Sequence, residues 1–374
     1  MAGLVIENLS KRFPAAKGQQ AVVALRELNL ETHDGELLVI VGPSGSGKST
    51  LLRLIAGLEA PDNGSIRING SRIDNLPPEQ RNVTMVFQNN ALYSHMTVRE
   101  NLACGLRWRG GQRAIIAEKV EVIAGKLGIH PTLDRLPEAL SGGEQQRVSL
   151  GRSAVLDPDL FLLDEPLAHL DAGLRHQLRQ EIRNLNRAAA TTLIHVTHDQ
   201  SEAISLGDRI AVMKDGAIQQ IGIPSEIYDA PASVFVAQFF GARPMNLIEG
   251  ILSITNGKLL LFTSDSKPLF RLTPPPLPSW TGSEKKNVLL GLRPEHFSII
   301  DRNIHLPASD SEYTFEDTIR FREFAGDAQY ITTRSGLTIK AAPTANLHEG
   351  DAIQVLADTS RSSLFARDSG ARIA

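Results

Sequence analysis

Between residues 42 and 50 the chain combines glycines, hydroxyl side chains and one lysine at the spacing of a phosphate-binding loop. The segment reads Gly-Pro-Ser-Gly-Ser-Gly-Lys-Ser-Thr and fits the pattern G-x-x-x-x-G-K-[ST]. Glycines let backbone N–H groups wrap around an anion, and the start of the next helix adds a positive dipole end. Lys48 is predicted to reach the β- and γ-phosphates of a nucleotide, and Ser49 to bind Mg²⁺. The predicted nucleotide-binding residues of this loop are Gly42, Pro43, Ser44, Gly45, Ser46, Gly47, Lys48, Ser49 and Thr50.

Two adjacent carboxylates end an apolar run further along the chain. The run covers residues 160–163, and Asp164 and Glu165 follow it directly. Asp164 is expected to hold Mg²⁺, and Glu165 to orient and deprotonate an attacking water. Because strand residues alternate between faces, the two carboxylates cannot do the same job. A buried strand that stops at a polar turn is the plainer interpretation, but the phosphate-binding loop in the same chain favours the catalytic one.

A second anion-binding turn is predicted at Ser141, Gly142 and Gly143, which open the sequence Ser-Gly-Gly-Glu-Gln-Gln-Arg. A helix that starts in this way is also suited to phosphate. The plainer interpretation is a capping box between Ser141 and Glu144. One nucleotide hardly needs two cradles from one subunit. We therefore expect this turn to close over a nucleotide held by a second copy of the chain, in a head-to-tail homodimer.

Apolar runs and helical patterns predict the elements that position these residues. Residues 37–41, 160–163 and 192–196 are short and apolar, and the helix-like stretches 50–58 and 172–190 precede or follow them. Such strands imply a sheet that is covered on both faces and has a parallel core. Residues 1–235 are therefore expected to form an α/β domain.

The texture of the sequence changes after about residue 236. Short strand-like pieces are separated by Gly, Pro, Asn and Asp, which predicts a smaller β-rich domain, barrel-like or OB-like, over residues 236–374. The proline-rich stretch 273–278 is expected to be a stiff connector, and 222–244 to be the hinge between the domains. The predicted strands are 246–254, 259–262, 287–292, 314–324, 330–333 and 353–356.

Composition narrows the functional classes. The chain has 374 residues, of which 42% are hydrophobic and 22% charged, as in a soluble protein of two domains. A formal net charge of −3 without a Lys/Arg-dense stretch argues against nucleic acid as a partner. Cys104 is the only cysteine, which excludes an internal disulfide. Because the sequence contains neither a secretory signal nor 18 consecutive apolar residues, we expect it to serve a membrane only through partners.

The order of the three motifs resembles that of ABC transporter ATPases, with Walker A first, then the Leu-Ser-Gly-Gly signature, then Walker B. This resemblance implies a P-loop nucleotidase (ABC ATPase) domain with a helical subdomain at about residues 89–155, and ATP and Mg²⁺ as cofactors. Gln88 resembles the Q-loop glutamine beside Mg²⁺ and water, and His198 the switch histidine at the γ-phosphate. Asp171 resembles the D-loop aspartate at the dimer seam, and Phe13 the aromatic residue that stacks on adenine. Taken singly, Phe13 and His198 would more often be packing residues.

The predicted site thus has a catalytic set and a metal-binding set. The catalytic residues are Lys48, Gln88, Glu165 and His198, and the metal ligands are Ser49, Gln88 and Asp164.

Three further stretches are similar to the ATPases of maltose and glycerol-3-phosphate importers, namely 89–102, 231–246 and 291–296. The resemblance implies a TOBE-type regulatory domain after the ATPase domain. It also implies a homodimer that works with two membrane-spanning permease subunits and an extracytoplasmic solute-binding protein, at the cytoplasmic face of the inner membrane. A carbohydrate or a glycerol-phosphate is the expected solute. ATPases of polyamine, sulfate and iron importers have a similar layout and stay open as alternatives.

ABC-type ATPases that act on nucleic acid or ribosomes are the rival class. Chromosome and repair members insert a long coiled coil before the signature, and the segment between Lys48 and Ser141 is too short for one. Ribosome-acting members carry two cassettes, whereas this chain has the motifs of one. Exporter ATPases are a further rival, but their cassettes seldom carry a β-rich C-terminal domain of this size.

Three departures from the importer pattern bear on rate and docking: Glu144 in place of Gln, Ala168 with His169 in place of Ser-Asn, and Ser94 in place of a common Pro.

Overall fold

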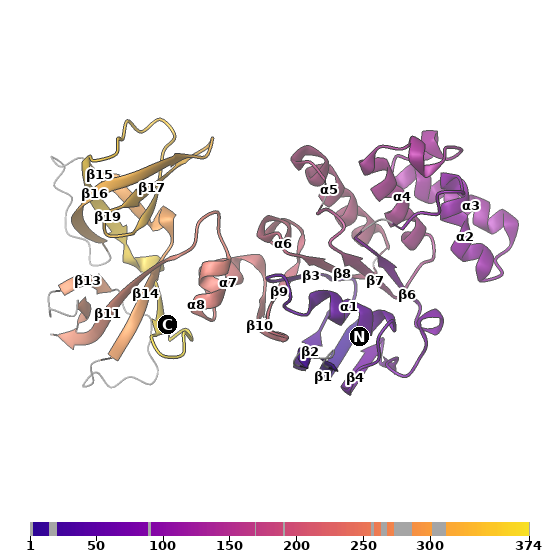
Figure 1. Ribbon diagram of the computed structural model, residues 1–374, viewed down its shortest axis with the longest axis horizontal. Helices are drawn as coiled ribbons and strands as arrows, with labels where there is room; N and C mark the ends of the chain where they lie inside the picture. Colours follow the sequence, from indigo (N-terminus) through magenta and orange to yellow (C-terminus); the bar gives the residue numbers. More distant parts are fainter. Residues whose placement is uncertain are drawn as a thin grey trace. The chain divides into compact units, whose positions relative to one another are not determined.

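The chain divides into two compact units, Met1–Pro224 and Ser225–Ala374. The computed structural model describes residues 3–14, 21–88, 91–168, 170–189, 191–255, 258–262, 268–272, 286–300 and 312–373 (Figure 1). The predicted hinge over 222–244 contains the end of the first unit. A boundary between independently folding domains at residues 235 and 236 stays a prediction.

The first unit is built on a largely parallel sheet with the strand order β10-β9-β3-β8-β7-β6. Only β10 runs antiparallel to its neighbour in this order. The strands β3 and β8 are buried along their whole length, as expected of apolar strands with both faces covered. The strands are β3 (Leu37–Val41), β6 (Val83–Val86), β7 (Leu160–Asp164), β8 (Thr192–Thr197), β9 (Arg209–Lys214) and β10 (Ala217–Gly222).

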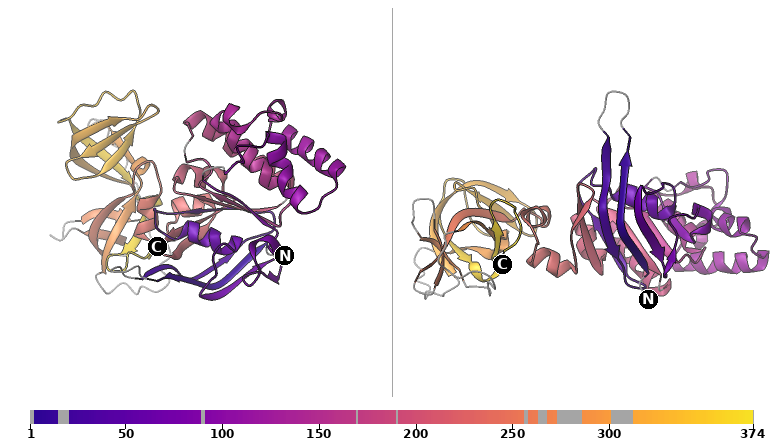
Figure 2. Two further views of the ribbon diagram at one scale, coloured as in Figure 1. Left: turned by 45° about the vertical axis from the view of Figure 1, so that its right-hand side comes forward. Right: turned by 90° about the horizontal axis from the view of Figure 1, so that it is seen from below.

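A second, antiparallel sheet has the order β2-β1-β4-β5. It consists of β1 (Leu4–Phe13), β2 (Val22–Glu31), β4 (Asn63–Ile68) and β5 (Ser71–Arg72), and Figure 2 shows β1 and β2 as one long ribbon. Helix α1 (Lys48–Ala56) lies between the two sheets, where its leucines join a core fed by both. This core fixes the loop that precedes α1.

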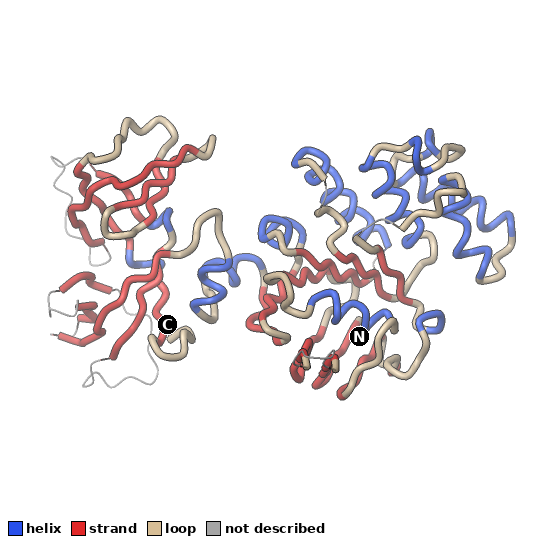
Figure 3. The backbone as a smooth tube through the Cα atoms, viewed as in Figure 1, coloured by secondary structure: helices blue, strands red, loops and turns tan. Residues whose placement is uncertain are grey.

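The other face of the main sheet carries α5 (Ala172–Ala189) and α6 (Gln200–Leu206) (Figure 3). The helical subdomain predicted at about residues 89–155 contains α2 (Val98–Trp108), α3 (Arg113–Lys126) and α4 (Gly142–Ala154). Short 3₁₀ turns join these elements, namely η1 (Pro78–Gln80), η2 (His130–Thr132) and η3 (Pro137–Ala139). Within the described ranges, no helix is both long enough and apolar enough to cross a membrane.

The second unit is β-rich, which confirms the sequence prediction. It starts with two short helices, α7 (Pro224–Asp229), whose first residue ends the first unit, and α8 (Val234–Phe239). Two antiparallel sheets follow, with the orders β13-β12-β11-β14-β20 and β15-β19-β16-β17-β18, and both contribute to one core. The proline-rich connector predicted at 273–278 lies outside the described residues. The first sheet contains β11 (Asn246–Thr255), β12 (Lys258–Phe262), β13 (Pro268–Leu272), β14 (Lys286–Leu292) and β20 (Ser363–Ala366). The second contains β15 (Phe297–Ile300), β16 (Glu312–Phe324), β17 (Gln329–Thr333), β18 (Thr338–Ala341) and β19 (Ala352–Asp358), with the 3₁₀ turns η4 (Pro294–His296) and η5 (Thr359–Arg361) nearby in sequence.

Candidate nucleotide-binding and hydrolysis site

The predicted phosphate-binding loop connects β3 to α1, and two of its glycines are packed against neighbouring backbone. A Cβ on Gly42 would lie 2.1 Å from the carbonyl oxygen of Met213, and one on Gly47 would lie 2.5 Å from that of Ala24. Gly47 caps α1 with a φ of 101°, in the left-handed region that a side chain disfavours. The loop is therefore wedged between β9 and β2, and neither glycine can be replaced without moving backbone.

The rim of the loop faces outward and its base faces the core. The residues at positions 43–45 and Ser49 are exposed, Thr50 is half-buried, and Ser46 is buried. The Ser46 Oγ has no hydrogen-bond partner among the described residues. Since the first N–H groups of any helix lack intrahelical acceptors, the start of α1 offers unpaired donors beside this exposed rim.

The Lys48 ammonium lies inside the loop. Its Nζ donates hydrogen bonds to the carbonyl oxygens of Gly42 at 2.8 Å and of Pro43 at 2.9 Å. Burial lowers the pKa of Lys48, while the carboxylates of Glu165 and Asp164 act in the opposite direction. A buried cation that is held by neutral carbonyls gains from an anionic partner. The loop therefore suits phosphate oxygens.

Ser49 and Asp164 form the part of the site that fits a metal ion. The Ser49 hydroxyl, at the start of α1, donates to Asp164 Oδ1, at the end of β7, over 3.1 Å. Burial raises the pKa of Asp164; the hydrogen bond from Ser49 opposes this, and the charge of Glu165 adds to it. Mg²⁺ takes oxygen ligands and commonly shares one or two carboxylates with substrate phosphates and water. The two side chains and the penalty on the carboxylate charge fit such a cation.

Glu165 and His198 pair across the ends of adjacent parallel strands. Glu165 follows β7 with a φ of 47°, which is uncommon for a residue other than glycine. Its N–H donates to the Val196 carbonyl of β8 at 3.0 Å, and its Oε2 lies 2.9 Å from His198 Nδ1. The Glu165 side chain is 20% exposed and that of His198 is 55% exposed. Strained backbone is common at catalytic positions, and here it presents a carboxylate to solvent beside the phosphate loop.

Gln88 and Phe13 lie at two further edges of this region. Gln88 is exposed two residues beyond β6, which pairs with β7. Phe13 ends β1 and pairs with Val22, two residues before Ala24, whose carbonyl would touch a Cβ at Gly47. The half-buried Phe13 ring also has the Lys11 ammonium 5.2 Å from its centroid. Phe13 thus stands on the ribbon that backs the phosphate loop.

The Ser-Gly-Gly turn starts α4, which Figures 1 and 2 show on the other side of the main sheet from α1. Ser141 and Glu144 form a capping box: Ser141 N–H and Oγ donate to Glu144 Oε2 at 2.8 and 2.7 Å, and Glu144 N–H donates to Ser141 Oγ at 3.3 Å. A Cβ on Gly143 would lie 2.7 Å from the Leu174 side chain of α5. Ser141 and Gly142 are exposed at this end. The turn therefore caps α4, as the plainer interpretation predicted, and it also leaves Ser141 and Gly142 exposed to solvent.

Asp171 lies just before α5. Its Oδ1 accepts the N–H of Leu174 at 2.9 Å, and its side chain is exposed. Asp171 and the Ser-Gly-Gly turn therefore flank the same leucine. His169, one of the predicted departures, lies outside the described residues, as do the residues at 89 and 90.

A groove that sequence reasoning did not identify lies between the helical subdomain and β6. It has a volume of about 450 Å³ and includes Met85, Tyr93, Trp108 and Arg152. The Trp108 side chain is 69% exposed, and its ring meets that of Tyr93 edge-on at 5.8 Å. The Arg152 guanidinium lies 5.4 Å from the centre of the Tyr93 ring. The sequence prediction had singled out only the neighbouring Ser94, although a tryptophan at a helix end was a usable signal.

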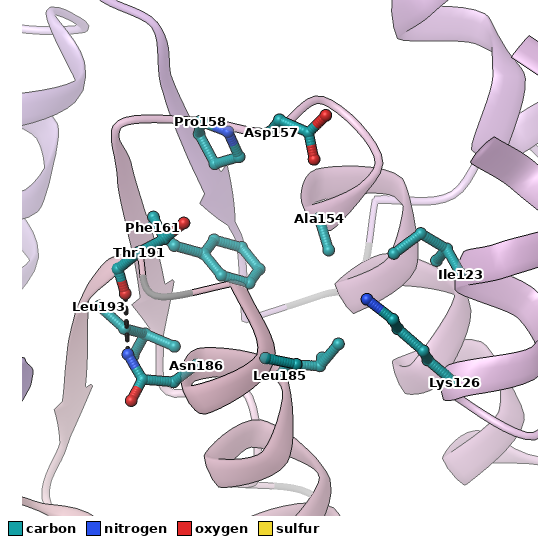
Figure 4. A pocket seen from close by; sticks show the side chains of 11 residues that line it. Ile123, Lys126, Ala154, Asp157, Pro158, Phe161, Leu185, Asn186, Thr191 and Leu193 are labelled. Atoms are coloured by element: carbon teal, nitrogen blue, oxygen red, sulfur yellow. Dashed lines mark hydrogen bonds between the residues drawn. The ribbon is translucent and has the colours of Figure 1, made fainter. Parts of the chain in front are cut away.

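A separate cavity of about 360 Å³ lies at the amino-terminal ends of β7 and β8, opposite the ends that carry Asp164 and Glu165 (Figure 4). Phe161 and Leu193 line it from the beginnings of β7 and β8, and Lys126 reaches it from α3. Asn186 on its wall donates to the Thr191 carbonyl at 2.8 Å. Because Asp164 and Glu165 lie at the far end of β7, this cavity is distinct from the phosphate-binding region.

Comparison with known proteins agrees with this geometry. Residues 25–168 match the family model described as ABC transporter. The chain is 41% identical over 376 residues to the sn-glycerol-3-phosphate import ATP-binding protein UgpC of Psychromonas ingrahamii, covering 100% of this chain and 96% of that protein. It is also 41% identical over 362 residues to the uncharacterized ABC transporter ATP-binding protein YurJ of Bacillus subtilis, covering 95% of each.

A solved structure with a similar fold is the dimeric, post-hydrolysis ATP-binding cassette MJ0796 bound to ADP and Pi. The TM-score is 0.53 at 29% identity, over 59% of this chain and 98% of that one. The similarity to UgpC and YurJ therefore covers nearly the full length of this chain and of both relatives. The chain belongs to the ABC transporter family, as one of its ATP-binding and ATP-hydrolysing subunits.

Proposed function

We propose that this chain energises an importer as a homodimer attached to two membrane-spanning permease subunits, at the cytoplasmic face of the inner membrane. The observation that carries this proposal is the arrangement of Glu165, His198, Asp164 and Ser49 beside the Lys48 loop. Two hydrogen-bonded pairs from three segments meet at one edge of a parallel sheet. Such an arrangement suits attack of water on a γ-phosphate, in which catalysis is mostly positioning and charge stabilisation.

Each side chain takes a role that its surroundings support. Lys48 moves from the loop carbonyls to the β- and γ-phosphate oxygens, and the N–H groups from Gly45 to Thr50 bind the same phosphates. Ser49 and Asp164 would hold Mg²⁺, with Gln88 at the neighbouring strand end. Bound Mg²⁺ would neutralise charge that develops on the phosphates.

Glu165 is the general base that orients the attacking water and accepts its proton. His198 holds the Glu165 carboxylate in place and reaches the γ-phosphate. The positive φ of Glu165 supports this role, because sparsely populated backbone conformations are common at active sites.

The twin subunit completes the site. The open face of Ser141, Gly142 and Gly143 would close over a nucleotide held by the partner's loop, with Asp171 at the seam. The opposite placement of α1 and α4 about the sheet supports this arrangement (Figure 1). The dimer named for the solved MJ0796 cassette gives independent support.

The test is the Glu165→Gln substitution in the full chain. It should reduce ATP turnover by about 10²-fold or more, leave ATP binding intact, and give an ATP-dependent dimer by light scattering. Glu118→Gln, at an exposed position of α3, is the matched control and should keep turnover. Turnover close to that of the parent would remove the base assignment. A strictly monomeric ATP-loaded Glu165→Gln chain, with permeases present, would remove the dimer.

We propose that the groove beside Trp108 receives a short segment of the permease. Its exposed indole, the Tyr93 ring and the Arg152 guanidinium offer apolar area and one cation, which is typical of interface anchors. Trp108→Ala should reduce co-purification with the permease from membranes at least tenfold while ATP binding by the isolated chain stays the same. Ile115→Ala removes a comparable exposed apolar side chain from α3 and should have no such effect. Equal recovery with both variants would place the docking surface elsewhere.

The solute is proposed to be a glycerol-phosphate or a carbohydrate, delivered by an extracytoplasmic binding protein. The name of the Psychromonas ingrahamii relative supports the first choice. Uptake of labelled glycerol 3-phosphate and of maltose by cells that lack this chain, with and without its restoration, distinguishes the two. If neither uptake depended on the chain, a different solute class would follow.

A further inference from the structure

A cavity in the second unit has three arginines among its lining residues. Its volume is about 390 Å³, and Arg293, Arg361 and Arg372 line it together with His296. Asp229 is the carboxylate among its lining residues in the described part of the chain. Three arginines therefore border one small space together with a single carboxylate. Arg361 and Arg372 are exposed, so they are free to pair with an anion that enters from solvent.

Arg293 is the most deeply placed of the three. It is 1% exposed, and its guanidinium donates to the carbonyl oxygens of Tyr228 at 2.8 Å and of Ala237 at 3.0 Å. It also bonds to the carbonyl of Phe240, and its Nε has no hydrogen-bond partner in the described residues. Burial lowers the pKa of Arg293, with nearby Tyr228 and Glu295 acting in the opposite direction. The Glu295 carboxylate already accepts the Tyr228 hydroxyl hydrogen at 2.5 Å.

Neutral side chains complete the lining. Ser360 and Ser362 both border the cavity, and the Ser362 hydroxyl donates to the Thr359 carbonyl at 2.8 Å. The backbone N–H of Arg293 donates to His296 Nδ1 at 3.3 Å, so in the neutral ring the proton lies on Nε2. Burial lowers the pKa of His296, which keeps this ring neutral near pH 7. Asp358 lies close by but is engaged by Ser360, whose N–H and hydroxyl both donate to its Oδ1. The donors that the lining offers to a ligand are thus mainly those of its arginines.

We propose that this cavity binds a small phosphate-bearing anion, either inorganic phosphate or a phosphate ester, through Arg361, Arg372 and the edge formed by Arg293. A phosphate group carries up to two negative charges and several acceptor oxygens, which match forked guanidinium donors better than a single carboxylate does. Tyr228 and Asp229 belong to α7, the first helix after the ATPase unit in the sequence. Bound phosphate would therefore join the start of the second unit to its β-sheets. The phosphate ester named for the importer relatives gives one candidate source of this chemistry.

The experiment must separate this cavity from the Lys48 loop, which also suits phosphate. Calorimetric titration of the full chain carrying Lys48→Ala, with inorganic phosphate, glycerol 3-phosphate and glycerol as separate probes, does so. We expect one phosphate-dependent site per chain, no binding of glycerol, and tighter binding of whichever phosphate source the cavity favours. The same titration of the unsubstituted chain saturated with ADP and Mg²⁺ repeats the measurement without the Lys48 substitution.

Arg361→Gln and Arg372→Gln, singly and together, identify the cavity as the site. Each should weaken phosphate binding about tenfold or more, because a charge-assisted hydrogen bond is lost. Arg320→Gln, at an exposed arginine of β16 outside the cavity, is the matched control and should bind as before. ATP binding and turnover should persist in the Arg361 and Arg372 variants, so failure here is distinguishable from failure of the catalytic proposal. Absence of phosphate binding in both backgrounds, or binding that all three arginine variants retain, would overturn the inference.

Discussion

Asp164 and Glu165 are adjacent carboxylates, and the charge of Glu165 adds to the effect of burial on the pKa of Asp164. Burial raises the pKa of Asp164, so the ionised carboxylate destabilises the folded chain relative to the unfolded one. For a group of this kind, the favourable contribution is present at low pH and is lost as the pH rises through the folded pKa. At pH 7 without Mg²⁺, the chain therefore carries a penalty that a bound cation would relieve.

Asp164→Asn should therefore stabilise the metal-free chain at pH 7 while abolishing Mg²⁺-dependent hydrolysis. We expect a rise in Tm of roughly 2 °C, which shrinks as the pH falls toward about 4 because the parent carboxyl becomes protonated. Thermal unfolding across pH, with and without Mg²⁺ and ATP, measures this. Asp34→Asn, at an exposed position, is the control. An unchanged or lower Tm for Asp164→Asn at pH 7 would contradict the assigned penalty.

Phe13 is the residue whose role depends most on shape. If its ring stacks on adenine, Phe13→Ala should weaken ATP binding about tenfold, since base stacking on an aromatic side chain contributes roughly 1–3 kcal/mol. Turnover at saturating ATP should change much less, because the base is remote from the reacting phosphate. Fluorescent nucleotide titration and steady-state kinetics separate the two quantities. An unaltered nucleotide affinity would leave Phe13 as a packing residue against Lys11.

The sequence predicted the position of each motif on the secondary structure where neighbouring residues form the motif, and the roles of these residues stay predictions. The loop around Lys48 and the Asp164–Glu165 pair occupy the strand ends expected of them. The Glu165–His198 hydrogen bond and the Ser49–Asp164 hydrogen bond join distant segments, and their geometry required the sheet register. The arginine-lined cavity could not be predicted, because the pairing of β14 with β20 brings Arg361 and Arg372 to the same cavity as Arg293.

At the scale of elements, α4 begins with a capping box in which Glu144 contributes a negative charge. Hydrogen bonds from the Ser141 hydroxyl and N–H lower the pKa of Glu144. A carboxylate whose pKa is lower in the folded than in the unfolded chain stabilises the fold at pH values above its unfolded-state pKa. This stabilisation is lost as the pH falls through its folded-state pKa. The carboxylate also favours the positive end of the helix dipole. The same charge would face the partner's nucleotide in the proposed dimer.

Glu144→Gln keeps a hydrogen-bond acceptor for Ser141 and removes the charge. We expect a loss of about 0.5 kcal/mol of stability at pH 7, which disappears in acid. In the Glu165→Gln background, the ATP concentration needed for dimerisation should fall several-fold, because a like charge near the triphosphate is removed. Thermal unfolding and light scattering at graded ATP measure both effects. Weaker dimerisation of the double variant would show that the charge assists closure instead.

Apolar runs in the sequence predicted several of the strands, whereas other elements could not be predicted. The strand predicted at 37–41 matches β3, and the β-rich pieces after 246 match strands to within a few residues. The antiparallel sheet with β1 and β2 was not predicted, because register shifts interrupt the alternation along that ribbon. Helices α7 and α8 have six residues each, too short for a 3.6-residue period to be visible.

At the scale of the whole molecule, the two units have separate cores, and every residue assigned to the proposed nucleotide site lies in the first. The core that holds α1 and the main sheet draws on residues between Leu4 and Ile221. Helices α7 and α8 instead form hydrogen bonds within the second unit, where the Arg293 guanidinium donates to the carbonyl oxygens of Tyr228 and Ala237. The place at which the chain is shortened should therefore matter for stability more than for ATP binding.

A chain that ends at Pro224 should fold and bind ATP as the full chain does, with affinity within about twofold, because no side chain assigned to the nucleotide lies beyond it. A chain that ends at residue 235 should bind ATP equally well but expose Ile227, which is fully buried in the full chain. Its last residues should therefore be removed rapidly by limited proteolysis, while the chain that ends at Pro224 resists. Nucleotide titration and timed digestion of the two chains make the comparison. If either shortened chain were folded by circular dichroism yet unable to bind ATP, the second unit would have to contribute to the nucleotide site, and the separation of chemistry from regulation would fail.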